Sequence, residues 1–379
     1  MTSMTGRIPT THTGSLARPP ELRDMLLARA RKQPVDAAAL NAAASKAVAD
    51  VVREQCKIGL DIINDGEQSK TGFALYVRDR LSGFEGESVR RAMSLEGREF
   101  PSLVGNLVPI QIAQPCTGPL KWKDFGAVER DIAVLKAATA NVEHRQVFMN
   151  AVSPGTFINF NPNRYYASQD EYVAVVVETM RREYEAIAAV GFILQIDSPD
   201  LAQRSYNYPD LSTEQWRKVV AENVDAINQA TRTIPREQIR VHVCWGANEG
   251  PHNHDTELKD VVHELIRLRA AAISIVAANG RHEHEWRIWE TVKLPDGMSL
   301  IPGVIDSTTN IIEHPQVVAD RLIRYGRILG RERIIAGVDC GFGTIVVERP
   351  KVDPAVAWAK LRSLVEGAQL ASRSLWGER

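Results

Sequence analysis

The chain has 379 residues, 44% of them hydrophobic and 25% charged, which is ordinary for a globular protein large enough to bury a sizeable core. Its 46 Lys and Arg residues nearly balance its 47 Asp and Glu residues, so nucleic acids and membrane surfaces are not expected partners. The first twenty residues contain no apolar segment of the signal-peptide type, and no uncharged apolar run approaches the roughly 20 residues that span a bilayer, so we expect a cytoplasmic protein.

The first 58 residues precede the first predicted strand. They contain a Pro-Pro turn at Pro19 and an Ala-rich amphipathic helix from about Val35 to Lys57, in which Cys56 is expected to pack in the core. We therefore predict an N-terminal extension over residues 1–58, packed on a catalytic barrel formed by residues 59–379.

Eight short apolar runs rich in Val and Ile follow, with charged amphipathic stretches such as 170–190 and 213–230 between them. Continuous apolar runs are typical of strands buried on both faces of a parallel sheet. Eight strand-then-helix units predict a single (β/α)8 TIM-type barrel, an α/β fold with an N-terminal helical extension. The competing doubly wound sheet is disfavoured because no Gly-rich dinucleotide fingerprint follows the first strand. The predicted strands are 59–65, 109–115, 147–153, 192–198, 239–245, 271–277, 299–305 and 334–340.

Polar residues gather where these predicted strands end. In a barrel of this kind the chemistry is located at the carboxyl ends of the strands, so this concentration predicts the active site. The strand-end residues are Asp65, Glu67, Cys116, Ser153, Asp197, His242, Cys244, Asp306, Asp339 and Cys340.

His242, Cys244 and Cys340 form a candidate metal site. His242 and Cys244 are two residues apart, so on a strand both side chains point to the same face, and Cys340 reaches the same end once the barrel closes. One imidazole and two thiolates suit tetrahedral zinc with an open fourth position. Four cysteines in a chain without a secretion signal do not indicate a disulfide framework. The competing interpretation is a satisfied core histidine beside two small buried cysteines.

Eight blocks in this order resemble the cobalamin-independent methionine synthase family. The similarity is to its C-terminal catalytic barrel and to single-barrel relatives that include epoxyalkane:coenzyme M transferases. It spans nearly the whole chain, and each block is weak alone. The blocks are 9–16 (PTTHTGSL), 59–68 (GLDIINDGEQ), 152–157 (VSPGTF), 195–202 (QIDSPDLA), 241–247 (VHVCWGA), 278–287 (ANGRHEHEWR), 301–308 (IPGVIDST) and 336–344 (AGVDCGFGT).

The resemblance implies zinc bound through His242, Cys244 and Cys340. It also implies that Ser15, Glu67 and Asp197 hold a homocysteine-like thiol, because these positions match the family's homocysteine motifs. Two carboxylates can clamp an α-ammonium, and a serine hydroxyl can bind a carboxylate. The implied partners are therefore a small-molecule thiol acceptor and an alkyl donor such as a methyltetrahydrofolate. The alternative is that both carboxylates are structural.

Two departures from the family pattern bear on the chemistry. The glutamate that completes the zinc shell in the synthases corresponds to Val276, and His282, Glu283, His284 or Glu285 in the following loop could supply a replacement. The histidine that protonates the leaving folate nitrogen is absent from 304–311. Proton delivery is then expected from Asp306, His12 or a water molecule.

Three functions remain open at this point. The first is a zinc-dependent methyltransferase that produces methionine or a similar thioether. The second is an epoxyalkane:coenzyme M transferase-like alkyltransferase or C–S lyase, which needs a cation near the metal for a sulfonate, with Arg18, Lys70 and Arg281 as candidates. The third is a binding protein without turnover, for which Val276 is the best support. The sequence does not indicate the oligomeric state.

Overall fold

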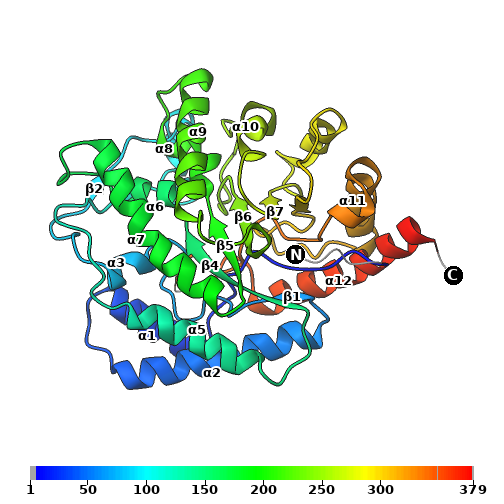
Figure 1. The fold of residues 1–379 in the computed structure, drawn as a ribbon, viewed down its shortest axis with the longest axis horizontal. Coiled ribbons are helices and arrows are strands. Elements are labelled where there is room, and N and C mark those ends of the chain that lie inside the picture. The colour runs from blue at the N-terminus through cyan, green and yellow to red at the C-terminus, as the bar shows by residue number, and fades with distance from the viewer. Residues whose placement is uncertain (1–5, 348, 378–379) are drawn as a thin grey trace.

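The computed structural model describes residues 6–347 and 349–377, and its centre is a curved parallel sheet (Figure 1). Six strands follow one another in the order β1-β4-β5-β6-β7-β8, all paired in parallel. Their bounds are β1 Ile62–Ile63, β4 Gln146–Val152, β5 Ile193–Asp197, β6 Ile239–Val243, β7 Ala272–Ile275 and β8 Ser299–Pro302.

Single parallel bridges close this sheet into a barrel. Thr11 is bridged to Ile62 in β1, Thr10 to Ala336, and Leu300 in β8 to Ile334. The barrel wall in the described residues therefore consists of the six strands and two further segments, at Thr10–Thr11 and Ile334–Ala336, that are paired through single bridges only. The predicted TIM-type α/β barrel is confirmed. Thr10 and Thr11, within the predicted N-terminal extension, are part of the wall, whereas the helices that follow them pack outside it.

The strand predicted at 109–115 is wrong as a barrel element. Its central residues form β3 (Ile112–Ala113), which pairs antiparallel with β2 (Val89–Arg90) in a separate two-stranded ribbon. Ile112 is 55% exposed, so this apolar run does not lie in the core. Pro109 and Pro115 flank the run, and proline is tolerated at the edge of a two-stranded ribbon but not within a buried parallel strand.

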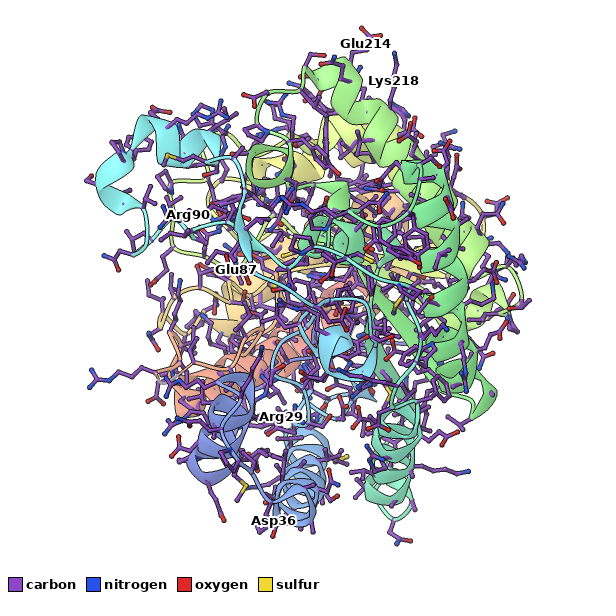
Figure 2. All side chains as sticks on the ribbon, turned by 90° about the vertical axis from the view of Figure 1, so that its left-hand side faces the viewer. Arg29, Asp36, Glu87, Arg90, Glu214 and Lys218 are labelled. Carbon is purple, nitrogen blue, oxygen red and sulfur yellow. The ribbon has the colours of Figure 1, made fainter. Side chains whose placement is uncertain are left out.

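Amphipathic helices cover the outside of the barrel. In α9 the buried residues Trp216, Val220 and Val224 recur at helical spacing, while Glu214 and Lys218 point away from the body (Figure 2). No helix in the described ranges is long and apolar enough to cross a membrane. The helices are α1 Pro20–Ala30, α2 Ala37–Lys57, α3 Tyr76–Arg80, α4 Leu95–Glu99, α5 Gly126–Thr139, α6 Pro154–Phe160, α7 Gln169–Ala189, α8 Arg204–Asn207, α9 Thr213–Ala230, α10 Leu258–Leu265, α11 Pro315–Leu329 and α12 Pro354–Trp376.

The interior of the barrel changes from apolar to polar along the strands. A small apolar cluster that includes Ile62, Phe148 and Ile193 is separate from the main core between sheet and helices. Arg240 lies over the Phe148 ring and donates to Gln195 Oε1 at 2.7 Å. Two residues further along the same strand comes His242. This order places titratable groups at the carboxyl end, on a rigid wall.

Candidate functional site

The three predicted metal ligands lie together at the carboxyl end of the barrel. One ligand atom from each of His242, Cys244 and Cys340 lies within 4.8 Å of the other two, and the two sulfurs are 3.3 Å apart. All three residues are buried. The contact between the sulfurs lowers the pKa of Cys244 well below its ordinary value and raises that of Cys340 well above it. Ionisation of both thiols at this distance would require a compensating cation, such as a divalent metal ion.

The imidazole of His242 is oriented by the neighbouring strand. Its Nδ1 lies 3.2 Å from Ser274 Oγ in β7, which is its register partner across the sheet. Its Nε2 is buried and has no hydrogen-bond partner. When Nδ1 carries the proton, the Nε2 lone pair is free for a metal, the usual arrangement for a ligating histidine.

The loop that follows β7 is fixed by Asp339, the residue before Cys340. Its carboxylate accepts hydrogen bonds of 2.7–2.9 Å from the backbone N–H groups of three consecutive residues, Ala277, Ala278 and Asn279. Val276, immediately before them, is buried. Residue 276, which the resemblance matches to a fourth ligand, therefore precedes a segment held by the neighbour of Cys340, and the valine side chain offers no donor atom.

The predicted replacement ligands do not join this cluster. His282 places its Nδ1 2.9 Å from Glu285 Oε2 and its Nε2 2.9 Å from Asp255 Oδ2. Asp255 Oδ2 also contacts His252 Nδ1 at 2.7 Å. Each ring nitrogen of His282 faces a carboxylate, so both donate and the ring is an imidazolium. Burial lowers the pKa of His282, but the two carboxylates outweigh it and raise that pKa to about 9.

This network holds together the loops that follow β6 and β7. Trp245, the neighbour of Cys244, packs its ring against His282 with the centroids 4.6 Å apart, and its Nε1 donates to Thr256 O at 2.6 Å. His282, Asp255 and Glu285 therefore position the segment that carries Cys244 without contacting the metal site themselves.

The charged state of His282 predicts a loss of stability in mild alkali. Because its folded pKa of about 9 exceeds the ordinary 6.5, its contribution is complete below pH 6.5, declines between 6.5 and 9, and is absent above 9. The free energy of unfolding should fall by about 3 kcal/mol over that window. Urea titrations at several pH values measure it. In His282→Gln this pH dependence should vanish, whereas exposed His284→Gln, two residues away, should retain it; equal slopes in all three proteins would contradict the assignment.

Asp197, a predicted substrate-binding residue, lies beside the candidate metal cluster, and Glu67, the second, is near Asp197. Asp197 ends β5 in register with His242, and its carboxylate accepts from Asn150 at 2.9 Å and Gln195 at 2.7 Å. Burial raises its pKa. Asp197 is thus a fixed acceptor at the rim of the metal cluster.

Glu67 has an unused oxygen. Its backbone adopts a left-handed φ of 53°, which fixes the turn after β1, and its Oε2 is buried without a partner. Burial raises the pKa of Glu67 to about 8, against the opposing charge of Lys70, and the nearby charge of Asp197 adds to the increase. An unpartnered buried carboxylate beside a second one is a binding position for a cation.

Ser15, the third predicted substrate residue, lies against the segment that carries Cys340. Ser15 O accepts from Phe342 N at 2.9 Å, and a Cβ at Gly341 would overlap the Ser15 hydroxyl. Glycine at 341 therefore allows the Ser15 hydroxyl to approach the backbone next to Cys340.

The three cationic side chains predicted as sulfonate-binding candidates already donate hydrogen bonds to backbone oxygens. Arg18 donates to the backbone oxygens of Leu16, Glu67, Lys70 and Gly343. Lys70 Nζ donates to Asn150 O at 2.6 Å and lies 4.4 Å from the centre of the Tyr76 ring. Arg281 donates to Asn253 O at the surface. The charge of Lys70 acts on both carboxylates, and the charge of Arg18 acts on Glu67.

Asp306 and His12, the predicted proton donors, are not members of the three-residue cluster. Asp306 Oδ1 accepts from Thr308 N and Thr308 Oγ1 at 2.7 and 2.8 Å, which stabilises its own loop. His12 contacts Gln55 Oε1 at 2.8 Å and is buried against Phe148. Burial lowers the pKa of His12 to about 4, so its ring is neutral at neutral pH and is a poor proton donor.

The sequence of this chain is similar to those of known proteins. Residues 8–369 match the family model described as cobalamin-independent synthase, catalytic domain. The 2-hydroxypropyl-CoM lyase of Xanthobacter autotrophicus is 25% identical, with 97% of this chain and 96% of that protein covered. The methionine synthase of Sulfolobus acidocaldarius is 23% identical, with 97% and 93% covered.

A solved structure has the same fold. The B12-independent methionine synthase from Shewanella sp. W3-18-1, in complex with selenomethionine, superposes with a TM-score of 0.75 at 20% identity, covering 98% of this chain and 100% of that one.

Proposed function

Since this chain belongs to the cobalamin-independent synthase family, we propose that it is a zinc-dependent methyltransferase acting on the thiol of a homocysteine-like amino acid. The observation that carries the proposal is the junction of two features. A cluster of one imidazole and two thiols with an unused His242 Nε2 lies beside the carboxylates of Glu67 and Asp197.

The three donors fit zinc. Nitrogen and sulfur ligands in this ratio are those of catalytic zinc sites, which keep one position open, and the close sulfurs need a dication to ionise together. Zinc, when bound, lowers the pKa of a thiol placed at the open position, so that sulfur is a nucleophile at neutral pH.

The surrounding side chains select the thiol by its ammonium group. Glu67 and Asp197 supply two carboxylates for one bound cation, and the nearby charges of Lys70 and Arg18 favour the ionised form of Glu67. The Glu67 Oε2 atom, buried without a partner, accepts from the ammonium. Ser15 lies on the Cys340 side, where its hydroxyl can donate to the substrate carboxylate. Held at both ends, the amino acid presents its sulfur to the metal side.

A thiol panel tests this function. Zinc-edge X-ray absorption is recorded with homocysteine, cysteine and 2-mercaptoethanesulfonate, and methyl transfer is followed with a panel of methyl donors. Homocysteine should add one sulfur to the metal shell and yield methionine with at least one donor. A metal shell unchanged by homocysteine, together with no methionine from any donor, would refute the proposal.

Glu67→Gln should weaken homocysteine binding by about tenfold or more, because a charge-assisted hydrogen bond is lost. In the free protein Glu67 is largely protonated at pH 7, since burial raises its pKa to about 8, so the bound ammonium must displace that proton. Wild-type affinity should therefore rise from pH 6 to 8. Calorimetry in two buffers of different ionisation enthalpy should show one proton fewer released by Glu67→Gln. Exposed Glu129→Gln serves as the control, and an unaltered proton count would contradict the role.

A second candidate is a C–S lyase or alkyltransferase acting on a sulfonate thiol. The full-length similarity to the Xanthobacter lyase and the lack of a histidine in 304–311 favour it. Against it, a sulfonate would meet two carboxylates, and the Lys70 ammonium already donates to Asn150 O. If 2-mercaptoethanesulfonate enters the metal shell and homocysteine does not, this candidate replaces the first.

A further inference from the structure

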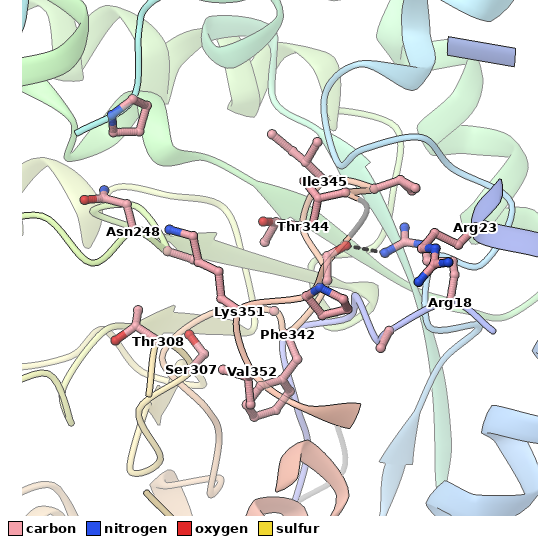
Figure 3. A pocket seen from close by; sticks show the side chains of 18 residues that line it. Arg18, Arg23, Asn248, Ser307, Thr308, Phe342, Thr344, Ile345, Lys351 and Val352 are labelled. Carbon is pink, nitrogen blue, oxygen red and sulfur yellow. Dashed lines mark hydrogen bonds between the residues drawn. The ribbon is translucent and has the colours of Figure 1, made fainter. Parts of the chain in front are cut away.

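A separate cavity of about 250 Å³ adjoins the candidate metal site (Figure 3). Gly341, the neighbour of Cys340, is part of its wall, as is Ser307, which follows Asp306 after β8. The cavity is smaller than the ~300–1,000 Å³ usual for drug-sized ligands. None of the thiol-binding residues Ser15, Glu67 and Asp197 lines it. It is therefore adjacent to the thiol position and distinct from it.

The wall of this cavity is apolar and basic. Phe342, Ile345 and Val352 provide apolar surface, and Arg18, Arg23 and Lys351 provide positive charge. No acidic residue is among its described lining residues. Arg18 is fixed by backbone carbonyls, so its charge contributes to the field without direct contact. The Lys351 side chain is 45% exposed and its amine lies 3.5 Å from a Glu249 carboxylate oxygen, so an incoming anion can compete for it.

Ser307 contributes a second, independent feature. Its side chain is buried, with 6% exposure, and its Oγ has no hydrogen-bond partner. Buried hydroxyls without partners are uncommon, because the desolvation cost is not recovered. A heteroatom of a bound molecule would supply the missing partner.

We propose that this cavity binds the alkyl donor, and that the donor is a compact molecule with an apolar body and one anionic group. This inference rests on the proposed function. The apolar walls enclose the body, Lys351 binds the anionic group, and Ser307 Oγ hydrogen-bonds the heteroatom that leaves. Figure 3 shows the Lys351 amine extending toward Asn248, with Arg18 and Arg23 on the other side of the cavity.

The transfer balances as a displacement. The thiol loses its proton, its sulfur forms the new S–C bond, and the bond between the alkyl carbon and the donor heteroatom breaks with the electron pair staying on the heteroatom. That heteroatom takes up one proton, so the thioether and the protonated leaving group carry all atoms and charge of the reactants. Ser307 positions the heteroatom and need not transfer the proton itself.

The test uses phenylacetate and its neutral isostere phenylacetamide as probes of the zinc-loaded full chain, with binding measured by ligand-observed NMR. Phenylacetate should bind about threefold to tenfold more tightly than the amide, as expected for a partly exposed ion pair. Lys351→Met should remove this preference, and Ser307→Ala should weaken both probes. Lys218→Met, on α9 outside the barrel beside Glu214, should change neither (Figure 2).

The outcomes separate this inference from the proposed function. Equal binding of the two probes, or a preference that survives Lys351→Met, overturns the donor assignment. Zinc content and homocysteine binding are measured on the same samples and should be unchanged in Lys351→Met. If wild-type protein binds neither zinc nor homocysteine, the proposed function fails, whatever the probes do.

Discussion

Cys244→Ser is expected to abolish stoichiometric zinc binding and to reduce methyl transfer by at least about a hundredfold. Changes to outer-shell partners alone typically cost 10–100-fold in metal affinity or activity, and this change removes a ligand itself. The serine hydroxyl does not ionise at neutral pH, so it cannot replace a thiolate. Metal analysis after zinc saturation, with rates measured on the same samples, checks the expectation.

Two further variants make this result specific. Cys340→Ser should behave like Cys244→Ser, because the two sulfurs are 3.3 Å apart and belong to one cluster. Cys116→Ser should retain zinc, since Cys116 lies against Gly118 O away from the three ligands. Zinc bound equally by all three proteins would show that the sulfurs do not hold it, and the chain would then be better described as a binding protein.

The spacing of two residues on one strand was enough to predict that His242 and Cys244 share a face. Cys340 required the additional assumption that the barrel closes, which holds because Thr10 and Ala336 are bridged. The wall itself was harder to predict. Thr10 and Thr11 were missed as part of the barrel wall because two threonines give no apolar periodicity. The run 109–115 was mistaken for a barrel strand because a short apolar run does not reveal which neighbour it pairs with.

Roles that depend on burial were also missed. Lys70 was predicted only as a cation for a sulfonate, because its place in a polar stretch after a turn does not indicate that it is buried. The fold buries it beside Glu67 and over Tyr76. His282 and Glu285 were considered as metal ligands because their residue types suit zinc. In the structure, Glu285 accepts the proton on His282 Nδ1, and Asp255, 27 residues earlier in the chain, accepts the proton on Nε2. The sequence does not reveal this contact with Asp255.

Val276→Glu is expected to convert the three-ligand cluster into a four-ligand site and to lower the zinc dissociation constant by about tenfold or more. Val276 directly follows β7, two residues beyond Ser274, whose hydroxyl contacts His242, and continued strand alternation would put the two side chains on the same face. The added carboxylate would make a formally neutral site negative. Competition with a chelator measures the change.

The same substitution should weaken thiol binding while it strengthens zinc binding. A fourth anionic ligand fills the position open to the thiol and lowers the ability of the metal to acidify it. Without zinc, the variant should be less stable than wild type, because a buried carboxylate lacks a partner. Glutamine has nearly the same shape as glutamate but no charge, so Val276→Gln should leave the zinc dissociation constant close to that of wild type. If the Glu and Gln variants bind zinc equally, residue 276 does not face the metal, and the open position must be explained by another residue.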